Sequence, residues 1–219
     1  MSLQILLQNK KLCVVNKASG TLSIPARTGE SDPRLVVGIE LQKQLGIQIF
    51  PVHRLDFEVS GVLIFALDAD THKILNHAFE NNLVKKTYQA FTSRTLDAKD
   101  FPLNEAMEWK SKIVRGKKRS FFAPHGKDSV THARLLKSTP ESPEWELKPI
   151  TGRSHQLRVE LASRGYPIVG DKLYGSPLDF MDNAIALRCV EIDLNAVPGH
   201  LGTVFSCEKI SKSQLKLLI

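Results

Sequence analysis

The chain has 219 residues, of which 42% are hydrophobic and 24% charged, so it can bury a core as one large domain or two small ones. It contains no apolar stretch of the roughly 18 residues that a membrane-spanning helix needs, and its N-terminus has no signal-peptide pattern. We therefore expect no membrane association. The formal net charge of +7 favours a polyanionic partner.

The cysteines and histidines give no metal-binding pattern. Cys13, Cys189 and Cys207 are odd in number and far apart, and none belongs to a CxxC pair. This usage predicts reduced core thiols in a cytoplasmic protein rather than a disulfide framework or a zinc site. His72 and His77 lie five positions apart, a spacing that does not align two ligands on one helix face, and no HExxH motif occurs.

The first fifty residues predict short strands and one helix. Strands are expected at Leu12–Val15 and Thr21–Ile24, with a loop over 25–33. The helix covers Arg34–Leu45, because apolar residues recur there at every fourth position and Gly46 is a suitable C-terminal glycine. A further strand, Ile47–Val52, leads into the most informative stretch.

That stretch is PVHRLDFEVSGVLIFAL, residues 51–67. Its apolar run, Val62–Leu67, has the length of a buried strand, and Ser60-Gly61 supplies turn chemistry ahead of it. Earlier still, His53, Arg54 and Asp56 place an imidazole, a guanidinium and a carboxylate within four residues. A loop before a rigid strand can hold reactive side chains over a scaffold. Alternatively, such an Asp caps backbone amides and the adjacent Arg points to water.

The middle of the chain predicts a helix and then a strand. The helix begins with Asp70-Thr71 as its N-cap and runs to about Asn81. The strand, Lys85–Phe91, alternates with period two and contains Lys86 and Tyr88. Taken alone, Tyr88 is typical of a core aromatic residue.

A strongly basic segment follows. Between positions 109 and 127 it holds seven basic residues and no acidic one: Lys110, Lys112, Arg115, Lys117, Lys118, Arg119 and Lys127. One interpretation is a solvated loop. The other is an arm that follows the phosphates of a nucleic acid, since such contacts dominate nucleic-acid affinity.

The last part of the chain again mixes strands with short helices. Strands are expected at 131–137, 145–150, 186–195 and 202–207, and a terminal helical turn or two at 211–219. The stretch TGRSHQLRVELASRGYPIVGDKLYG, residues 151–175, predicts a turn, a helix that opens at Arg153 or Ser154 and ends at Gly165, and a loop. The whole pattern predicts a single α+β domain over 1–219, with a mixed, largely antiparallel β-sheet flanked by helices and loops.

Three of these stretches resemble the motifs of the RluA-type pseudouridine synthases. They are HRLD at 53–56 with SG at 60–61, KTY at 86–88, and TGRSHQLR with GYPIVGDKLYG between 151 and 175. Their order and spacing agree with the family, and the resemblance extends from about Leu6 to Phe205. Two positions depart from it: Val59 replaces a hydroxyl residue, and Glu160 replaces a common His. Both departures are expected to affect packing or substrate preference.

The resemblance implies the pseudouridine synthase fold and the isomerisation of uridine to pseudouridine in RNA, without metal or organic cofactor. Asp56 is then the catalytic carboxylate. Arg153 pairs with Asp56 and keeps it ionised in a site that excludes water, where desolvation opposes the charge. Tyr88 stacks against the uracil and confines it.

Four further residues are implied as substrate-binding: Arg54, Leu157, Lys86 and His53. Leu157 would form an apolar wall opposite Tyr88. Arg54 would occupy the space that the flipped uridine leaves, since a base must leave its stack to be reached. Loop uridines of ribosomal RNA, transfer RNA or both are the expected targets, and a monomer suffices. Many relatives carry an N-terminal S4-like module, for which the residues before the first motif leave no room.

Two other functions are compatible with parts of the sequence. A non-catalytic RNA-binding or RNA-folding factor on the same fold would keep the basic surface without needing Asp56 and Arg153 together. A glycosidase would use paired carboxylates, for which Asp56 and Asp171 are candidates. Release of label from RNA tritiated at uridine C5, with no free uracil, separates the three.

Overall fold

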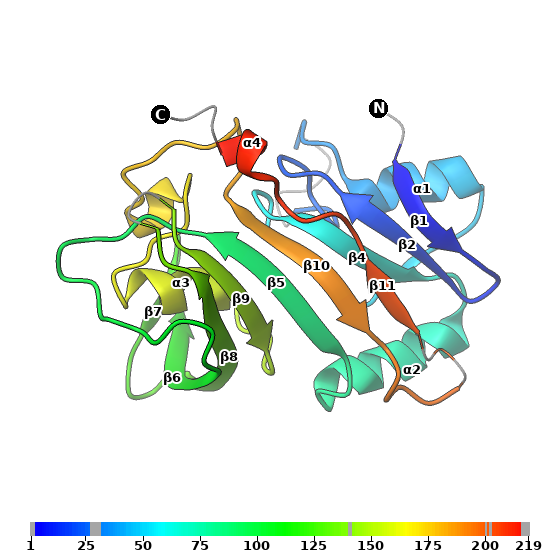
Figure 1. The fold of residues 1–219 in the computed structure, drawn as a ribbon. Coiled ribbons are helices and arrows are strands. Elements are labelled where there is room, and N and C mark those ends of the chain that lie inside the picture. The colour runs from blue at the N-terminus through cyan, green and yellow to red at the C-terminus, as the bar shows by residue number, and fades with distance from the viewer. Residues whose placement is uncertain (1–2, 27–31, 140–141, 200, 202, 216–219) are drawn as a thin grey trace. The chain divides into compact units, whose positions relative to one another are not determined.

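The computed structural model describes residues 3–26, 32–139, 142–199, 201 and 203–215 (Figure 1). The chain forms two compact units. The N-terminal unit comprises Met1–Lys85 and Cys189–Glu208, and the C-terminal unit comprises Lys86–Arg188 and Lys209–Ile219. The single domain predicted over 1–219 stays a prediction. In the described ranges no helix has the length and apolar character that crossing a membrane requires.

The N-terminal unit is built on a largely antiparallel set of strands. Its strands are β1 (Gln4–Gln8), β2 (Leu12–Lys17), β3 (Phe50–Pro51), β4 (Ser60–Ala66), β10 (Leu187–Asp193, most of which lies in this unit) and β11 (Val204–Ser206). The order is β1-β2-β4-β10, with β3 added to β4 and β11 added to β10. From Gly61 onward β4 is apolar and buried, which makes it a rigid support for the loop that precedes it.

Two helices pack on these strands. α1 (Val37–Leu45) contributes Val37 and Leu41 to a core with Val15, Leu63 and Phe65. α2 (Ala69–Glu80) begins earlier than predicted. Its N-cap is Asp68, whose Oδ1 accepts the backbone N–H of Thr71 at 2.7 Å, so the expected cap at Asp70-Thr71 is wrong.

Gly61 has a different role from the predicted one. Ser60 and Gly61 are the first residues of β4 rather than a turn. Gly61 adopts φ +119°, and a Cβ atom placed there would lie 2.1 Å from the carbonyl oxygen of Cys189. Only glycine fits this position, because L side chains rarely adopt that backbone conformation and the neighbouring atom belongs to the backbone.

The C-terminal unit contains a run of strands whose neighbours pair antiparallel. In spatial order its strands are β5 (Lys85–Phe91), β9 (Glu144–Pro149), β8 (Lys127–Lys137), β6 (Met107–Arg115) and β7 (Ser120–Phe122). α3 (Gln156–Ala162) lies beside β7 in Figure 1. The 3₁₀-helix η2 (Lys172–Tyr174) and α4 (Lys212–Leu215) complete the unit. Its core includes a group of aromatic rings in contact with one another, formed by Phe101, Trp109, Trp145 and Tyr166, in which both Phe101 and Trp145 contact the other three.

The predicted α+β class and the largely antiparallel sheet are confirmed. Thr21–Ile24 is not a strand, because only Leu22 forms an isolated bridge, to Val36. The strand predicted over 47–52 shrinks to Phe50–Pro51. The basic segment is not a loop but a strand, a tight turn and a second strand, β6 and β7. All three cysteines are free thiols, and Cys13 and Cys189 are buried.

Candidate active site

Asp56 is half-buried on the loop between β3 and β4. Hydrogen bonds to the backbone of this loop hold it in place. The hydroxyl of Ser23 accepts the N–H of Leu55 and donates to the carbonyl of the same residue, both at 3.0 Å. The N–H of Val59 donates to the carbonyl of Asp56 at 3.1 Å, and Gly20 N–H donates to the carbonyl of Phe57. The carboxylate of Asp56 therefore projects from a backbone with little freedom.

Lys17 is the second support of this loop, and sequence reasoning missed it. The side chain is 1% exposed, and its Nζ donates to the carbonyls of Ala18, Phe57 and Val59 at 2.9, 3.3 and 2.8 Å. Three acceptors match the three N–H groups of an ammonium. Burial lowers the pKa of Lys17 from 10.5 to about 7, and the negative charges of Asp56 and Glu58 oppose this shift.

His53 and Arg54 lie on the same loop but in different surroundings. The Nε2 atom of His53 accepts the backbone N–H of Ile64 on β4 at 3.0 Å, so the ring proton is assigned to Nδ1. The His53 ring also stacks on Phe79 of α2, with centroids 5.0 Å apart. Arg54 is exposed. The imidazole thus joins the loop to its own unit, while the guanidinium is available at the surface; their substrate-binding roles stay predictions.

In the C-terminal unit, Lys86 and Tyr88 are half-buried at the start of β5, where Tyr88 is in register with Leu147 of β9. Their positions differ by two along a strand, so they share one face of the sheet. The second half of β5 is buried. Tyr88 is therefore placed at the end of the strand that is not fully enclosed by the core.

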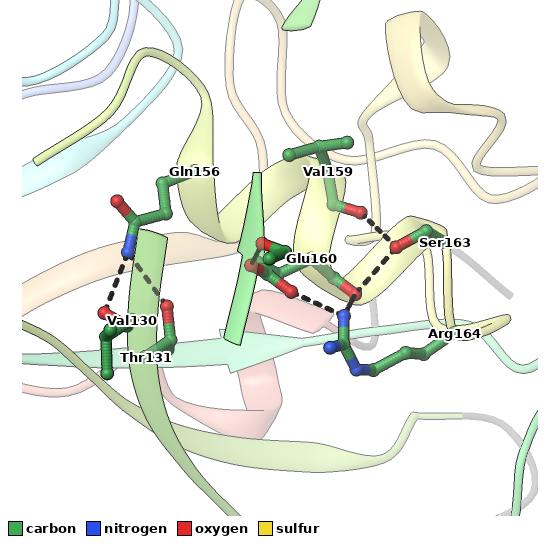
Figure 2. Close-up of polar contacts among 8 residues, drawn as sticks. Val130, Thr131, Gln156, Val159, Glu160, Ser163 and Arg164 are labelled. Atoms are coloured by element: carbon green, nitrogen blue, oxygen red, sulfur yellow. Dashed lines mark hydrogen bonds and ion pairs between the residues drawn. The ribbon is translucent and has the colours of Figure 1, made fainter. Parts of the chain in front are cut away.

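Arg153 lies in the turn before α3, and Gln156 fixes that turn. The side-chain oxygen of Gln156 accepts the N–H of Arg153 and the hydroxyl of Thr151, both at 2.9 Å. Its amide nitrogen donates to the carbonyl of Val130 at 3.1 Å and to the hydroxyl of Thr131 at 2.9 Å (Figure 2). Gln156 is 4% exposed, and its buried amide hydrogen-bonds both to the turn and to β8, which fastens the turn to that strand.

The guanidinium of Arg153 is itself oriented, because its Nε donates to the carbonyl of Asp128 at 2.8 Å. Leu157, one turn further on, is buried at 6% exposure in the first turn of α3. The structure thus brings Arg153 and Leu157 together in one unit and His53, Arg54 and Asp56 together in the other. The ion pair of Asp56 with Arg153 stays a prediction.

Asp171, the second carboxylate of the glycosidase hypothesis, has a structural environment. It is 1% exposed and accepts two hydrogen bonds from Arg158, at 2.7 and 2.8 Å. Arg158 is 2% exposed. The buried carboxylate of Asp171 is neutralised by the bidentate ion pair with Arg158, and its burial leaves it no access to a substrate.

Comparisons with known proteins show the family of the chain. A profile of the family described as RNA pseudouridylate synthase matches residues 11–163. The dual-specificity RNA pseudouridine synthase RluA of Haemophilus influenzae is 36% identical over 178 residues, covering 80% of this chain and 78% of that protein. The protein of the same name from Vibrio cholerae is 32% identical over 99% of this chain and 87% of its own length. The chain belongs to the RNA pseudouridylate synthase family.

Solved structures agree on the fold of this RNA pseudouridine synthase. Human RNA pseudouridylate synthase domain containing 1 superposes with a TM-score of 0.74 at 21% identity, over 95% of this chain and 84% of that one. Human RNA pseudouridylate synthase domain containing 4 gives 0.73 at 23% identity, over 99% and 94%. The resemblance inferred from three motifs is therefore confirmed, and the glycosidase hypothesis is not supported.

The basic segment of the synthase forms a hairpin, which we call the basic hairpin: β6, β7 and the turn between them. Two of the seven cations are paired with acids just outside residues 109–127, Lys110 with Glu108 at 2.6 Å and Lys112 with Asp128 at 3.4 Å. Four exposed cations remain at the hairpin tip, and no described carboxylate pairs with them: Arg115, Lys117, Lys118 and Arg119. Phe121 and Phe122, 45% and 38% exposed, follow directly.

Glu160, where the family commonly has His, is a packing position here. Its side chain is fully buried and accepts a hydrogen bond from the hydroxyl of Ser111 on β6. Its other oxygen accepts Nη1 of Arg164 at 2.5 Å (Figure 2). The guanidinium of Arg164 lies 4.2 Å from the centroid of the Trp109 ring, also on β6. The buried charge of Glu160 is thus paired and hydrogen-bonded, as burial of a carboxylate requires.

Proposed function

We propose that the chain converts loop uridines of ribosomal RNA, transfer RNA or both to pseudouridine, with Asp56 as the nucleophile. The observation that carries the proposal is the support of the Asp56 loop: a half-buried carboxylate stands on a backbone that Ser23 and the buried Lys17 hold from below. A reacting group must be held near its productive geometry, and here the fixed part is the main chain itself.

The reaction rearranges atoms without adding or removing any. The bond between N1 of uracil and C1′ of the ribose breaks, the base turns, and a bond forms between C5 and C1′. The proton on C5 leaves and N1 acquires one. A carboxylate nucleophile and an enclosure that keeps the detached base are sufficient for this sequence of steps.

Arg153 and Tyr88 are proposed to complete the chemistry. Arg153 is suited to accompany a carboxylate, because its planar fork can bind two oxygens and its orientation is already set through Asp128. Tyr88, at the partly open end of β5, is proposed to stack on the uracil, with Leu157 as the apolar wall and Lys86 and His53 as further substrate-binding residues.

Arg54 and the basic hairpin are proposed to act on the RNA rather than on the base. The exposed Arg54 would fill the space vacated by the flipped uridine, because unstacking a base costs roughly a few kcal/mol. The hairpin tip supplies cations for phosphates, and Phe121 and Phe122 offer faces on which unpaired bases can stack. Relatives named dual-specificity synthases support more than one RNA target. We propose that the enzyme acts in the cytoplasm as a monomer.

The decisive experiment compares three proteins on RNA tritiated at uridine C5. Wild type should release tritium without free uracil, and Asp56→Asn should keep the fold and the RNA affinity but lose turnover by a factor of at least about 10³. Asp70→Asn, which removes an exposed carboxylate at the start of α2, is the matched control and should turn over normally. Substantial turnover by Asp56→Asn would remove Asp56 from the nucleophile role. Binding without tritium release by wild type would favour the non-catalytic RNA-binding factor.

A further inference from the structure

The basic hairpin is joined to α3 through its first strand. Ser111 of β6 donates its hydroxyl proton to the buried carboxylate of Glu160 on α3, and Arg164 stacks over Trp109 of the same strand. Arg164 is held in turn by Glu160, at both the side chain and the carbonyl (Figure 2). One charged group therefore fixes the lateral position of β6 against the helix.

The second strand is joined to the same helix through Tyr174. Its hydroxyl oxygen accepts the N–H of Ser120 at 2.8 Å, and the hydroxyl donates to the carbonyl of Ser120 at 3.1 Å. Nδ1 of His155, the residue before α3, lies 3.1 Å from the same oxygen and donates to it when Nδ1 carries the proton. The hydroxyl of Ser120 donates to the carbonyl of Ser154 at 2.7 Å.

Tyr174 is rigidly placed to make these bonds. It closes η2, and the guanidinium of Arg158 lies 5.4 Å from its ring centroid. Arg158 belongs to α3 and is locked by the buried pair with Asp171. The ring of Tyr174, its hydroxyl and strand β7 are therefore all held in place relative to α3, the helix that follows Arg153.

We propose that Tyr174 and Glu160 are positioning residues that hold the basic hairpin at a fixed offset from Arg153, so that RNA bound at the hairpin tip is presented to the reacting groups in one register. The inference rests on the proposed function, because it requires the tip to bind RNA and Arg153 to take part in the reaction. Binding of RNA at the hairpin tip then raises kcat only while Tyr174 and Glu160 connect the hairpin to α3.

A double-mutant cycle tests the connection. One arm neutralises the tip with Arg115→Gln, Lys117→Gln, Lys118→Gln and Arg119→Gln; the other is Tyr174→Phe, which deletes the hydroxyl that joins Ser120 to His155. In wild type the tip substitutions should weaken RNA binding, reduce the slope of log affinity against log salt by about 3, and lower kcat about tenfold. Tyr174→Phe should leave the RNA Kd within about twofold of wild type and lower kcat about tenfold.

The combined variant shows whether the two effects are coupled. If the connection transmits the benefit of tip binding, the tip substitutions should change kcat less than about twofold in the Tyr174→Phe background. Multiplicative effects, with kcat about a hundredfold below wild type, would overturn the proposal, since a merely structural tyrosine gives that result. A tip that affects neither binding nor kcat would overturn it as well.

Two further variants control for effects on folding and packing. Tyr166→Phe is the matched control, because it also deletes a buried hydroxyl of this unit, one that donates to the carbonyl of Lys99 at 2.9 Å. The tip substitutions should keep their full tenfold effect in that background. Should Tyr174→Phe fail to fold, Ser120→Ala removes the bond to Ser154 and replaces it in the cycle. Activity of Asp56→Asn would contradict the proposed nucleophile separately from the outcome of this cycle.

Discussion

The loop that carries Asp56 and the turn that carries Arg153 are both held through their main chains, but by groups of different chemistry. Below Asp56 the carbonyls of Phe57 and Val59 accept hydrogen bonds from the buried ammonium of Lys17. Beside Arg153 the neutral amide of Gln156 donates and accepts four hydrogen bonds. A cation can serve several carbonyls at once but responds to pH, whereas an amide serves both donors and acceptors and does not titrate.

The largest difference between the two regions should appear at their glycines. Gly61→Ala forces a Cβ atom against the backbone of Cys189 at a left-handed φ, so the expected loss of unfolding free energy is about 4 kcal/mol or more. Gly152→Ala, directly before Arg153 in its turn, meets no atom within 4 Å and should cost less than about 1 kcal/mol. Urea denaturation of both variants measures this, and equal losses would contradict the crowding assigned to Gly61.

The next effect concerns Gln156. Gln156→Ala removes the four hydrogen bonds of a buried side chain, so the N–H of Arg153 loses its side-chain acceptor and the carbonyl of Val130 loses one of its donors. We expect a loss of about 3 kcal/mol in unfolding free energy, together with a fall in kcat, because Arg153 is no longer fixed. The stability loss should be the same at pH 6 and pH 9. A loss that changes with pH would show that a titrating group shares this support.

The third effect, at Lys17, is small near neutral pH and grows as the pH rises. The folded-state pKa of about 7 lies below the ordinary 10.5, so between these values the unfolded chain binds a proton that the folded chain has released. The unfolding free energy of wild type relative to Lys17→Met should therefore rise with pH above 7, by about 1.4 kcal/mol per unit, and be flat below it. Parallel denaturation series at pH 6 to 9.5 measure the difference. A flat difference throughout would mean that Lys17 stays protonated.

Sequence reasoning predicted the strands well where periodicity is strong. β4 and β5 were found because one is uniformly apolar and the other alternates. The strand predicted at Thr21–Ile24 was wrong, because strand propensity does not produce a strand unless a partner strand lies beside the segment, and there only Leu22 forms an isolated bridge. The helix cap was misplaced because Asp68 and Asp70 have the same capping chemistry, and only the observed bond to Thr71 distinguishes them.

The residues of the candidate site were predicted from the sequence, but the residues that hold them in place were not. Lys17 reads as an ordinary surface lysine, since its acceptors at Phe57 and Val59 lie 40 and 42 positions away. The count of seven cations in the basic segment is correct, but the ion pair of Lys112 with Asp128 could not be predicted, because strand register rather than proximity in the chain places these two residues opposite each other. The role of Tyr174 depends on a contact with Ser120 across 54 positions, which no local pattern reports.

The contact of Tyr174 with Ser120 has a consequence for self-association. β7 is the last strand in the order of its sheet, and an edge strand presents free N–H and C=O groups that can template pairing with another chain. A single phenol hydroxyl occupies both of these groups at Ser120, which is 2% exposed. Tyr174, which holds the basic hairpin, therefore also prevents another chain from pairing with the edge strand β7 at Ser120.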